Sequence, residues 1–301
     1  MAQGENPVVQ QRRLRAELRR IREDAGQYQK DVADALEWSV SKLIRIETGA
    51  VSISKTDLIA LLHHYGVKDQ KRVDNLVDVA RHSRQTAWWD KYRDQFGAQF
   101  MTFLGYEASA LLIRQFQALT LPGLLQTKEY ATALMTSFGN EPEQINRGVA
   151  VRLERQRLFD QPKPPEMFFV LDEAVVRRWV GGADVMRAQL QRIKELNRLP
   201  NVSIQIARFN IGAYIGMKGS FTVFEFPYEE NDYAVLLEYA HRDVLVQNNP
   251  EEASNFVETF YELEDVAAPT SETDKIIDEI LATIPTSEPA TKGATDVPAE
   301  A

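Results

Sequence analysis

The chain has 301 residues, enough for two domains, and a hydrophobic content of 44%, which is ordinary for a globular protein. It contains no cysteine, which excludes disulfides and thiolate metal sites. No apolar run reaches the roughly 18 residues of a membrane span, and the polar amino-terminal segment lacks the apolar stretch of a secretory signal. We therefore expect a cytoplasmic protein without a membrane segment, a metal or a cofactor.

The net charge of −9 is divided unevenly along the chain. Residues 1–93 contain 17 Lys and Arg against 13 Asp and Glu, a net charge of +4. Residues 94–301 contain the remaining 18 against 31, a net charge of −13. Screening limits the reach of charges to about 8–10 Å at physiological salt, so a basic head can bind phosphate beside an acidic body.

Residues 1–11 are polar and are expected to be a flexible N-terminus. The spacing of Leu14, Leu18 and Ile21 then predicts a first helix, which ends at Gly26. Residues 27–49, QYQKDVADALEWSVSKLIRIETG, predict two further short helices joined by a tight turn. The inward faces of these two helices carry Val32, Ala33 and Leu36, and then Leu43 and Ile46.

The outward face of the second short helix is too polar for a core, because it carries Val40, Ser41, Lys42, Ile44 and Arg45. Such a helix on a compact bundle fits the major groove of double-stranded DNA. We expect Val40, Ser41, Ile44 and Arg45 to read bases, with Arg45 able to make a bidentate contact to guanine. The residues expected to contact phosphates are Gln29 and Lys55.

Residues 12–67 resemble the Cro/cI-type helix-turn-helix of the xenobiotic-response-element family of bacterial regulators. Gln29 and Ala33 match the first motif helix, and residues 43–49 match the ending I-x-R-I-E-x-G. The resemblance implies an all-α bundle of five helices, a homodimer on near-palindromic sites, and an ion pair between Arg22 and Glu47. Glu37 stands where the family usually has Gly, which should cost about 1 kcal/mol if its φ is positive.

Two more helices, from Ser54 and over 68–85, complete a helix-turn-helix domain expected at 12–85. Residues 86–105 are rich in aromatic side chains and are expected to be a linker or hinge. This segment either packs the head onto the body or onto a second subunit, or stacks nucleobases.

From Tyr106 onward the resemblance is to a second family. The segments TLPGLLQTKEYATALM (120–135), VAVRLERQRLF (149–159) and FFVLDEAVVRRWVGG (168–182) are similar to the effector-like domain of unknown function of many actinobacterial regulators. This resemblance covers about 106–265. It implies an antitoxin-like regulator, since such proteins often occur beside genes for small partner proteins.

The residue patterns of this body predict an α/β domain with one mixed sheet. Strands are expected at 167–171, 202–207, 221–226 and 234–239, with helices between them and a final helix at 250–264. Residues 266–301 form a C-terminal extension, which is expected to be disordered from about 285 because it cannot bury a core. The predicted fold class is therefore α plus α/β.

No enzyme is expected. The segment His241-Arg242-Asp243 to Asn248 has the spacing of a kinase catalytic loop, but the glycine-rich loop, strand lysine and Asp-Phe-Gly are missing. Residues 212–220 contain glycines and a lysine without a P-loop frame, and are expected to be a hairpin or mobile loop. An enzyme fused to a DNA-binding head stays a third possibility.

A basic helix stands out in the acidic body, and its Arg152, Arg155 and Gln156 are the candidate residues for a partner or effector site. These residues could hold a small acidic protein or an anionic small-molecule effector, or could form a surface helix with internal ion pairs. Two functions follow. The first is a sequence-specific transcriptional regulator, nucleoid-associated when bound to DNA; the second is an antitoxin-like protein that mainly sequesters a small protein.

Overall fold

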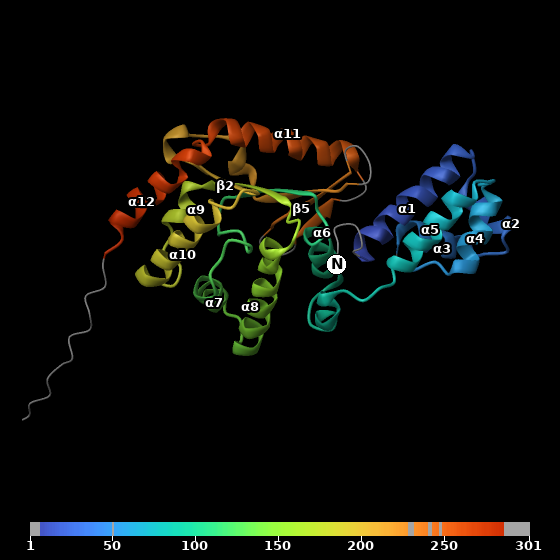
Figure 1. Ribbon diagram of the computed structural model, residues 1–301, viewed down its shortest axis with the longest axis horizontal. Helices are drawn as coiled ribbons and strands as arrows, with labels where there is room; N and C mark the ends of the chain where they lie inside the picture. The colour runs from blue at the N-terminus through green and yellow to red at the C-terminus, as the bar shows by residue number, and fades with distance from the viewer. Residues whose placement is uncertain (1–6, 50, 228–231, 240–242, 247–248, 286–301) are drawn as a thin grey trace, which may run out of the picture. The chain divides into compact units, whose positions relative to one another are not determined.

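The computed structural model describes residues 7–49, 51–227, 232–239, 243–246 and 249–285 (Figure 1). Among the helices in these ranges, none is long and apolar enough to cross a membrane. The tail predicted to be disordered lies outside the described residues from 286 on, as do His241 and Arg242. The chain divides into two compact units: one of Met1–Gln115, Arg157–Met167 and Gly219–Phe260, and one of Phe116–Gln156, Phe168–Lys218 and Tyr261–Ala301.

The first unit begins with a bundle of five helices, as predicted: α1 (Pro7–Asp24), α2 (Gln29–Ala35), α3 (Val40–Thr48), α4 (Lys55–His64) and α5 (Gln70–His82). The expectation of a flexible segment at 1–11 is wrong for residues 7–11, which form the first turns of α1. The reason is apolar contact: Val9 is buried, and the Val8 side chain lies against Gly105 of helix α6 (Ala98–Glu107).

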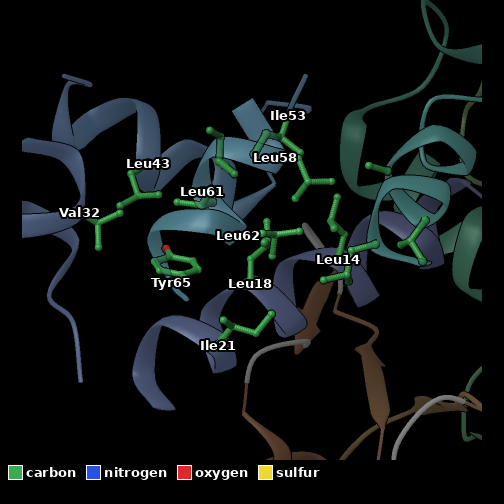
Figure 2. Close-up of a cluster of buried hydrophobic side chains, with 14 residues drawn as sticks. Leu14, Leu18, Ile21, Val32, Leu43, Ile53, Leu58, Leu61, Leu62 and Tyr65 are labelled. Atoms are coloured by element: carbon green, nitrogen blue, oxygen red, sulfur yellow. The ribbon is translucent and has the colours of Figure 1, made fainter. Parts of the chain in front are cut away.

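The core of this bundle is a single cluster of buried side chains, aliphatic except for Tyr65, to which all five helices contribute (Figure 2). Each fully buried Leu, Ile or Val contributes about 1.5–3 kcal/mol relative to its exposed state, so this cluster is the main source of stability for the bundle. Its labelled members are Leu14, Leu18, Ile21, Val32, Leu43, Ile53, Leu58, Leu61, Leu62 and Tyr65.

The aromatic segment that follows the bundle consists of the 3-10 helix η1 (Trp88–Tyr92) and helix α6. Its rings contact one another in series from Trp88 to Phe103, with centroids 4.9–6.4 Å apart. Phe103 then meets Phe224 of strand β4 (Phe221–Glu225) at 5.9 Å. Rings that pack on one another in this way favour a structural role over the stacking of nucleobases.

The strands form a six-stranded sheet in the order β3-β2-β1-β4-β5-β6, which confirms the predicted mixed sheet. Strands β4, β5 and β6 run antiparallel, and Val223 pairs with Val235, which pairs in turn with Val246. The remaining strands are β1 (Leu112–Gln117), β2 (Glu166–Asp172), β3 (Val202–Ala207), β5 (Tyr233–Leu237) and β6 (Val244–Val246). Phe221 of β4 packs on Phe256 and Phe260 of helix α11 (Pro250–Val266).

In the second unit, helix α10 and β3 pack against a helix that was not predicted, α12 (Thr273–Thr283). Ile276, Ile277 and Ile280 of α12 are buried, and Thr273 donates a hydrogen bond to the Ile204 carbonyl at 2.5 Å. The other helices of the body are α7 (Lys128–Ser137), α8 (Pro142–Gln156), α9 (Glu173–Arg177) and α10 (Ala183–Leu196), with 3-10 turns η2 (Arg157–Asp160), η3 (Phe209–Ile211), η4 (Ile215–Lys218) and η5 (Thr270–Glu272).

Candidate nucleic-acid interface

Helix α3 is a well-delimited helix with one buried side. Ser39 precedes it in an extended conformation, and the Ser39 hydroxyl accepts a hydrogen bond from the Lys42 amide at 3.2 Å, which caps the N-terminus. Gly49 ends the helix at φ 74°, a left-handed conformation that favours glycine. Leu43 and Ile46 are buried in the bundle core, so the register of the helix is fixed by the residues on its inner side.

The outer side of α3 is open to solvent. Ser41, Ile44 and Arg45 are exposed, and Val40 is half-buried. Ile44 keeps 40% of its surface accessible, beside the exposed Arg45. Thr48, one turn after Ile44, is also exposed, and its hydroxyl donates to the Ile44 carbonyl at 2.8 Å. An apolar side chain among short polar and basic ones is the composition expected of a helix that reads base edges.

Lys42 lies differently from the other outward residues. Its ammonium group is 3.8 Å from the centroid of the Trp38 ring and 3.2 Å from Oδ1 of Asp57 on α4. Both contacts are partly exposed, so each is weak and can be exchanged for a phosphate. Lys55, at the start of α4, is exposed.

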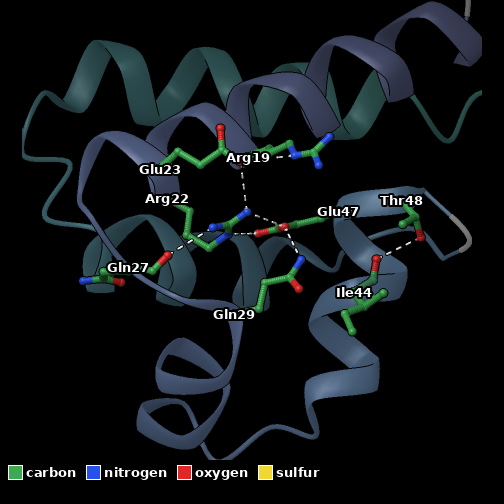
Figure 3. Close-up of polar contacts among 8 residues, drawn as sticks. All are labelled: Arg19, Arg22, Glu23, Gln27, Gln29, Ile44, Glu47 and Thr48. Atoms are coloured by element: carbon green, nitrogen blue, oxygen red, sulfur yellow. Dashed lines mark hydrogen bonds and ion pairs between the residues drawn. The ribbon is translucent and has the colours of Figure 1, made fainter. Parts of the chain in front are cut away.

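A buried polar network fixes α3 relative to α1 and α2 (Figure 3). Nε and Nη2 of Arg22 lie 2.7 and 3.1 Å from the two carboxylate oxygens of Glu47, and each residue keeps only 8% of its surface accessible. Arg22 also donates to the Gln27 carbonyl at 3.0 Å. The hydrogen bond to Glu47 raises the pKa of the Arg22 guanidinium above its ordinary value.

Gln29, expected to contact phosphate, belongs to the same network. Its side-chain amide donates to Oε2 of Glu47 at 2.7 Å, so that oxygen accepts from both Arg22 and Gln29. The amide of Gln29 thus helps to position α3. The sequence contained a signal for this role, because Gln29 and Glu47 both match the helix-turn-helix motif and the motif fixes where they lie in the bundle.

The turn between α2 and α3 contains Glu37 at φ 55°, the one non-glycine residue with a positive φ in the described part of the chain. The Trp38 amide donates to the Ala33 carbonyl at 2.8 Å, which closes the turn. Glu37 itself is exposed, so its carboxylate needs no partner. The strain expected for this position is therefore present.

Two contacts from α1 to the end of α3 were not foreseen from the sequence. Arg15 Nη1 donates to the Thr48 carbonyl at 2.7 Å, and Gln11 Nε2 donates to the Gly49 carbonyl at 2.9 Å. A cation at the C-terminus of a helix stabilises the carbonyls that lack helical partners. Gln11 fell within the N-terminus expected to be flexible, and the helical spacing gave Arg15 no partner.

In the second unit, the three candidate effector residues come together on α8 beside the loop PGLLQT. Gln156 Nε2 donates to the carbonyls of Gly123 and Gln126 at 3.1 and 2.6 Å, so its amide is engaged in holding that loop. Arg155 lies so near Gly123 that a Cβ there would be 2.9 Å from Nη1. Arg152 is half-buried on the same helix.

Residues 13–76 match the family described as a helix-turn-helix domain, and residues 100–279 match the family described as a domain of unknown function, DUF5753. The chain belongs to the DUF5753 family. Both resemblances drawn from the motifs are thereby confirmed, and the helix-turn-helix indicates a DNA-binding regulator. No curated protein matches the chain, and no solved structure matches it.

The PGLLQT loop of the DUF5753 domain is held by a second amide, for which the sequence carries no signal. Gln189 of α10 is fully buried; its Oε1 accepts from the Thr127 amide at 2.6 Å and its Nε2 donates to the Leu125 carbonyl at 2.8 Å. The Tyr130 hydroxyl accepts from the Leu121 amide at 3.3 Å, and burial raises the pKa of this phenol. The loop of the DUF5753 domain is therefore rigidly supported from α7, α8 and α10.

Proposed function

We propose that this DUF5753 protein is a sequence-specific DNA-binding transcriptional regulator whose body senses a partner protein or ligand. The observation that carries the first half is the solvent-exposed outer side of α3, with Ile44 and Arg45 unobstructed on a helix whose inner side is fixed in the core. The net charge of +4 over residues 1–93 supports binding to a polyanion.

In the proposed complex, α3 enters the major groove of double-stranded DNA, where Val40, Ser41, Ile44 and Arg45 contact base edges. Lys42 exchanges its contacts with Asp57 and Trp38 for a phosphate, and Lys55 contacts a phosphate from the start of α4. The side-chain amide of Gln29 has two N–H donors, of which one donates to Glu47 and the other contacts a phosphate from the start of α2. The buried ion pair between Arg22 and Glu47 holds α3 in position for these contacts.

We infer further that the protein binds as a homodimer. Helix-turn-helix heads read about half of a near-palindromic site each, with half-sites one helical turn apart. A head with a net charge of +4 gains only a modest general attraction to DNA, and the acidic body repels DNA, so a second head supplies the affinity for tight specific binding.

For the body, we propose that Arg152 and Arg155 present positive charge to an anionic effector or a small acidic protein, with Gln156 supporting the adjacent loop. The position of both arginines beside a loop held by several buried amides supports this, because a rigid loop gives a defined surface. The second candidate function is an antitoxin-like protein that sequesters such a partner, with DNA binding secondary.

The test of the regulator is capture of genomic DNA fragments by the full-length protein, followed by measurement of binding to the recovered motif. We expect a near-palindromic motif with half-sites about 10 base pairs apart. Absence of any binding to duplexes at low salt would refute the proposal.

The partner is tested by co-purification with full-length protein carrying Arg152→Gln and Arg155→Gln, with Arg192→Gln and Arg198→Gln as the charge-matched control.

A further inference from the structure

The end of the recognition helix is held by one side of α1. The backbone of Gly49 lies directly against the Arg15 side chain, so closely that a Cβ on Gly49 would be 2.4 Å from Arg15 Cδ. The Arg15 guanidinium donates to Thr48 at the helix terminus. Arg15 therefore supports the last turn of α3, which begins just after Ile44 and Arg45, and a displacement of Arg15 removes this support.

The same side of α1 is attached to the sheet one turn earlier. Arg12 pairs with Asp232 through Nη2, 2.9 Å from Oδ1, and donates to the carbonyl of Tyr233 in strand β5. Its guanidinium also lies over the rings of Tyr106 and Phe226, 5.4 and 5.0 Å from their centroids. The side chains of Arg12 and Asp232 are 12% and 17% accessible, so this contact is far better shielded than the surface pairs of α1.

Tyr106 of α6 is a shared neighbour of the two arginines. It lies under Arg12, and its hydroxyl is a neighbour of the Arg15 guanidinium. A continuous series of contacts thus runs within the first unit from Asp232 and Tyr233 through Arg12, Tyr106 and Arg15 to the end of α3. Its members are the carboxylate of Asp232, the guanidinium groups of Arg12 and Arg15, the ring of Tyr106, and the backbone carbonyls of Tyr233 and Thr48.

From this series we infer that Arg12 and Arg15 are positioning residues for DNA binding. A change in the position of strand β5 alters the position of the C-terminal end of α3 through these two side chains. The inference rests on the proposed function, since it concerns how DNA affinity is tuned. Neither arginine needs to touch DNA for this role. Through these contacts, the binding of a ligand to the body near Asp232 would change the position of α3.

The variant that separates this role from general electrostatics is Asp232→Asn in the full-length protein. It keeps the size of the side chain and removes one negative charge. Its matched control is Glu143→Gln on α8, which removes one negative charge from an exposed pair with Arg147. General electrostatics makes both variants bind DNA slightly more tightly, because a carboxylate that repels phosphates is lost.

The positioning role predicts the opposite sign for Asp232→Asn. We expect its affinity for the captured DNA motif to fall by about fivefold or more, the lower end of ordinary couplings between sites. The slope of affinity against salt should stay that of the wild type, because no phosphate contact is lost. Hydrogen exchange at the amides of Thr48, Gly49 and Val51 should become faster in this variant and stay unchanged in Glu143→Gln.

Affinity equal to that of the control, a smaller salt slope, or unchanged exchange at the end of α3 would each overturn the inference. If the wild-type protein binds no duplex at all, the proposed function fails. The exchange experiment then decides the positioning role alone, since it needs no DNA.

Discussion

The side chains of Arg22 and Glu47 form a buried ion pair in which both carboxylate oxygens accept hydrogen bonds from one guanidinium, at 2.7 and 3.1 Å. The pair joins the end of α1 to the end of α3. Leu43 and Ile46 fix the inner side of α3, and this polar contact, together with those of Arg15 and Gln11, sets the position of its C-terminal half.

Replacement of Arg22 by alanine should destabilise the bundle by about 3–5 kcal/mol, because it leaves a buried carboxylate without its cation. The matched control is Arg19→Ala on the same helix, whose pair with Glu23 is more than half exposed and should cost less than about 1 kcal/mol. Urea unfolding of both variants measures the difference. An equal loss of unfolding free energy in both variants would show that the buried pair contributes no more to stability than the exposed one.

Replacement of Arg45 by alanine should reduce affinity for the specific DNA site by about 1–3 kcal/mol and relax the preference at one base pair. Fold stability should hardly change, since Arg45 is exposed. Binding curves on the specific site, on single-base variants and on random duplex measure this, with Arg192→Ala in the body as the control for lost charge. A loss of the same size on random duplex contradicts base reading.

Replacement of Glu37 by glycine should stabilise the protein by about 0.5–1 kcal/mol, since a residue with a side chain is strained at φ 55° and glycine is not. The same substitution at Glu129, which is exposed in the first turn of α7, should destabilise by up to about 1 kcal/mol. Opposite shifts of the urea midpoint are expected. Shifts of the same sign would mean that the turn is not strained.

Replacement of Gln189 by leucine should destabilise the body by about 1–3 kcal/mol, because the Thr127 amide and the Leu125 carbonyl lose their partner. Gln191, two residues further along α10 and exposed, provides the control, and Gln191→Leu should be nearly neutral. Thermal unfolding measures both. A neutral Gln189→Leu would show that the PGLLQT loop does not depend on this amide.

The bundle could be predicted because its core residues recur at helical spacing and its caps, Ser39 and Gly49, are typical of helix ends. Strand β1 could not. It contains Arg114, Gln115 and Gln117, which read as polar surface, yet all three are buried. Arg114 is satisfied by Glu225 at 2.9 Å, a partner 111 residues away that no local pattern reveals.

The same limit applies to the candidate interface. The exposed residues of α3 follow from amphipathic spacing, so the exposure of Ile44 and Arg45 could be predicted. Gln11 and Arg15, which hold the end of that helix, lie on a different helix and donate to backbone carbonyls. Every residue has such a carbonyl, so the sequence does not show which one will be the partner. The role of Gln189 was hidden for the same reason.

The strand order β3-β2-β1-β4-β5-β6 has a consequence for how the protein is made. Strand β1 ends at Gln117, but its neighbour β4 begins only at Phe221. During synthesis on the ribosome, β1 must therefore wait for a distant stretch of nascent chain, whereas every core residue of the head has emerged by Ala80. A polypeptide whose synthesis stops midway would have a folded helical bundle and an incomplete sheet. The edge of β1 that normally pairs with β4 would be exposed, which makes such a chain a substrate for chaperones and proteases.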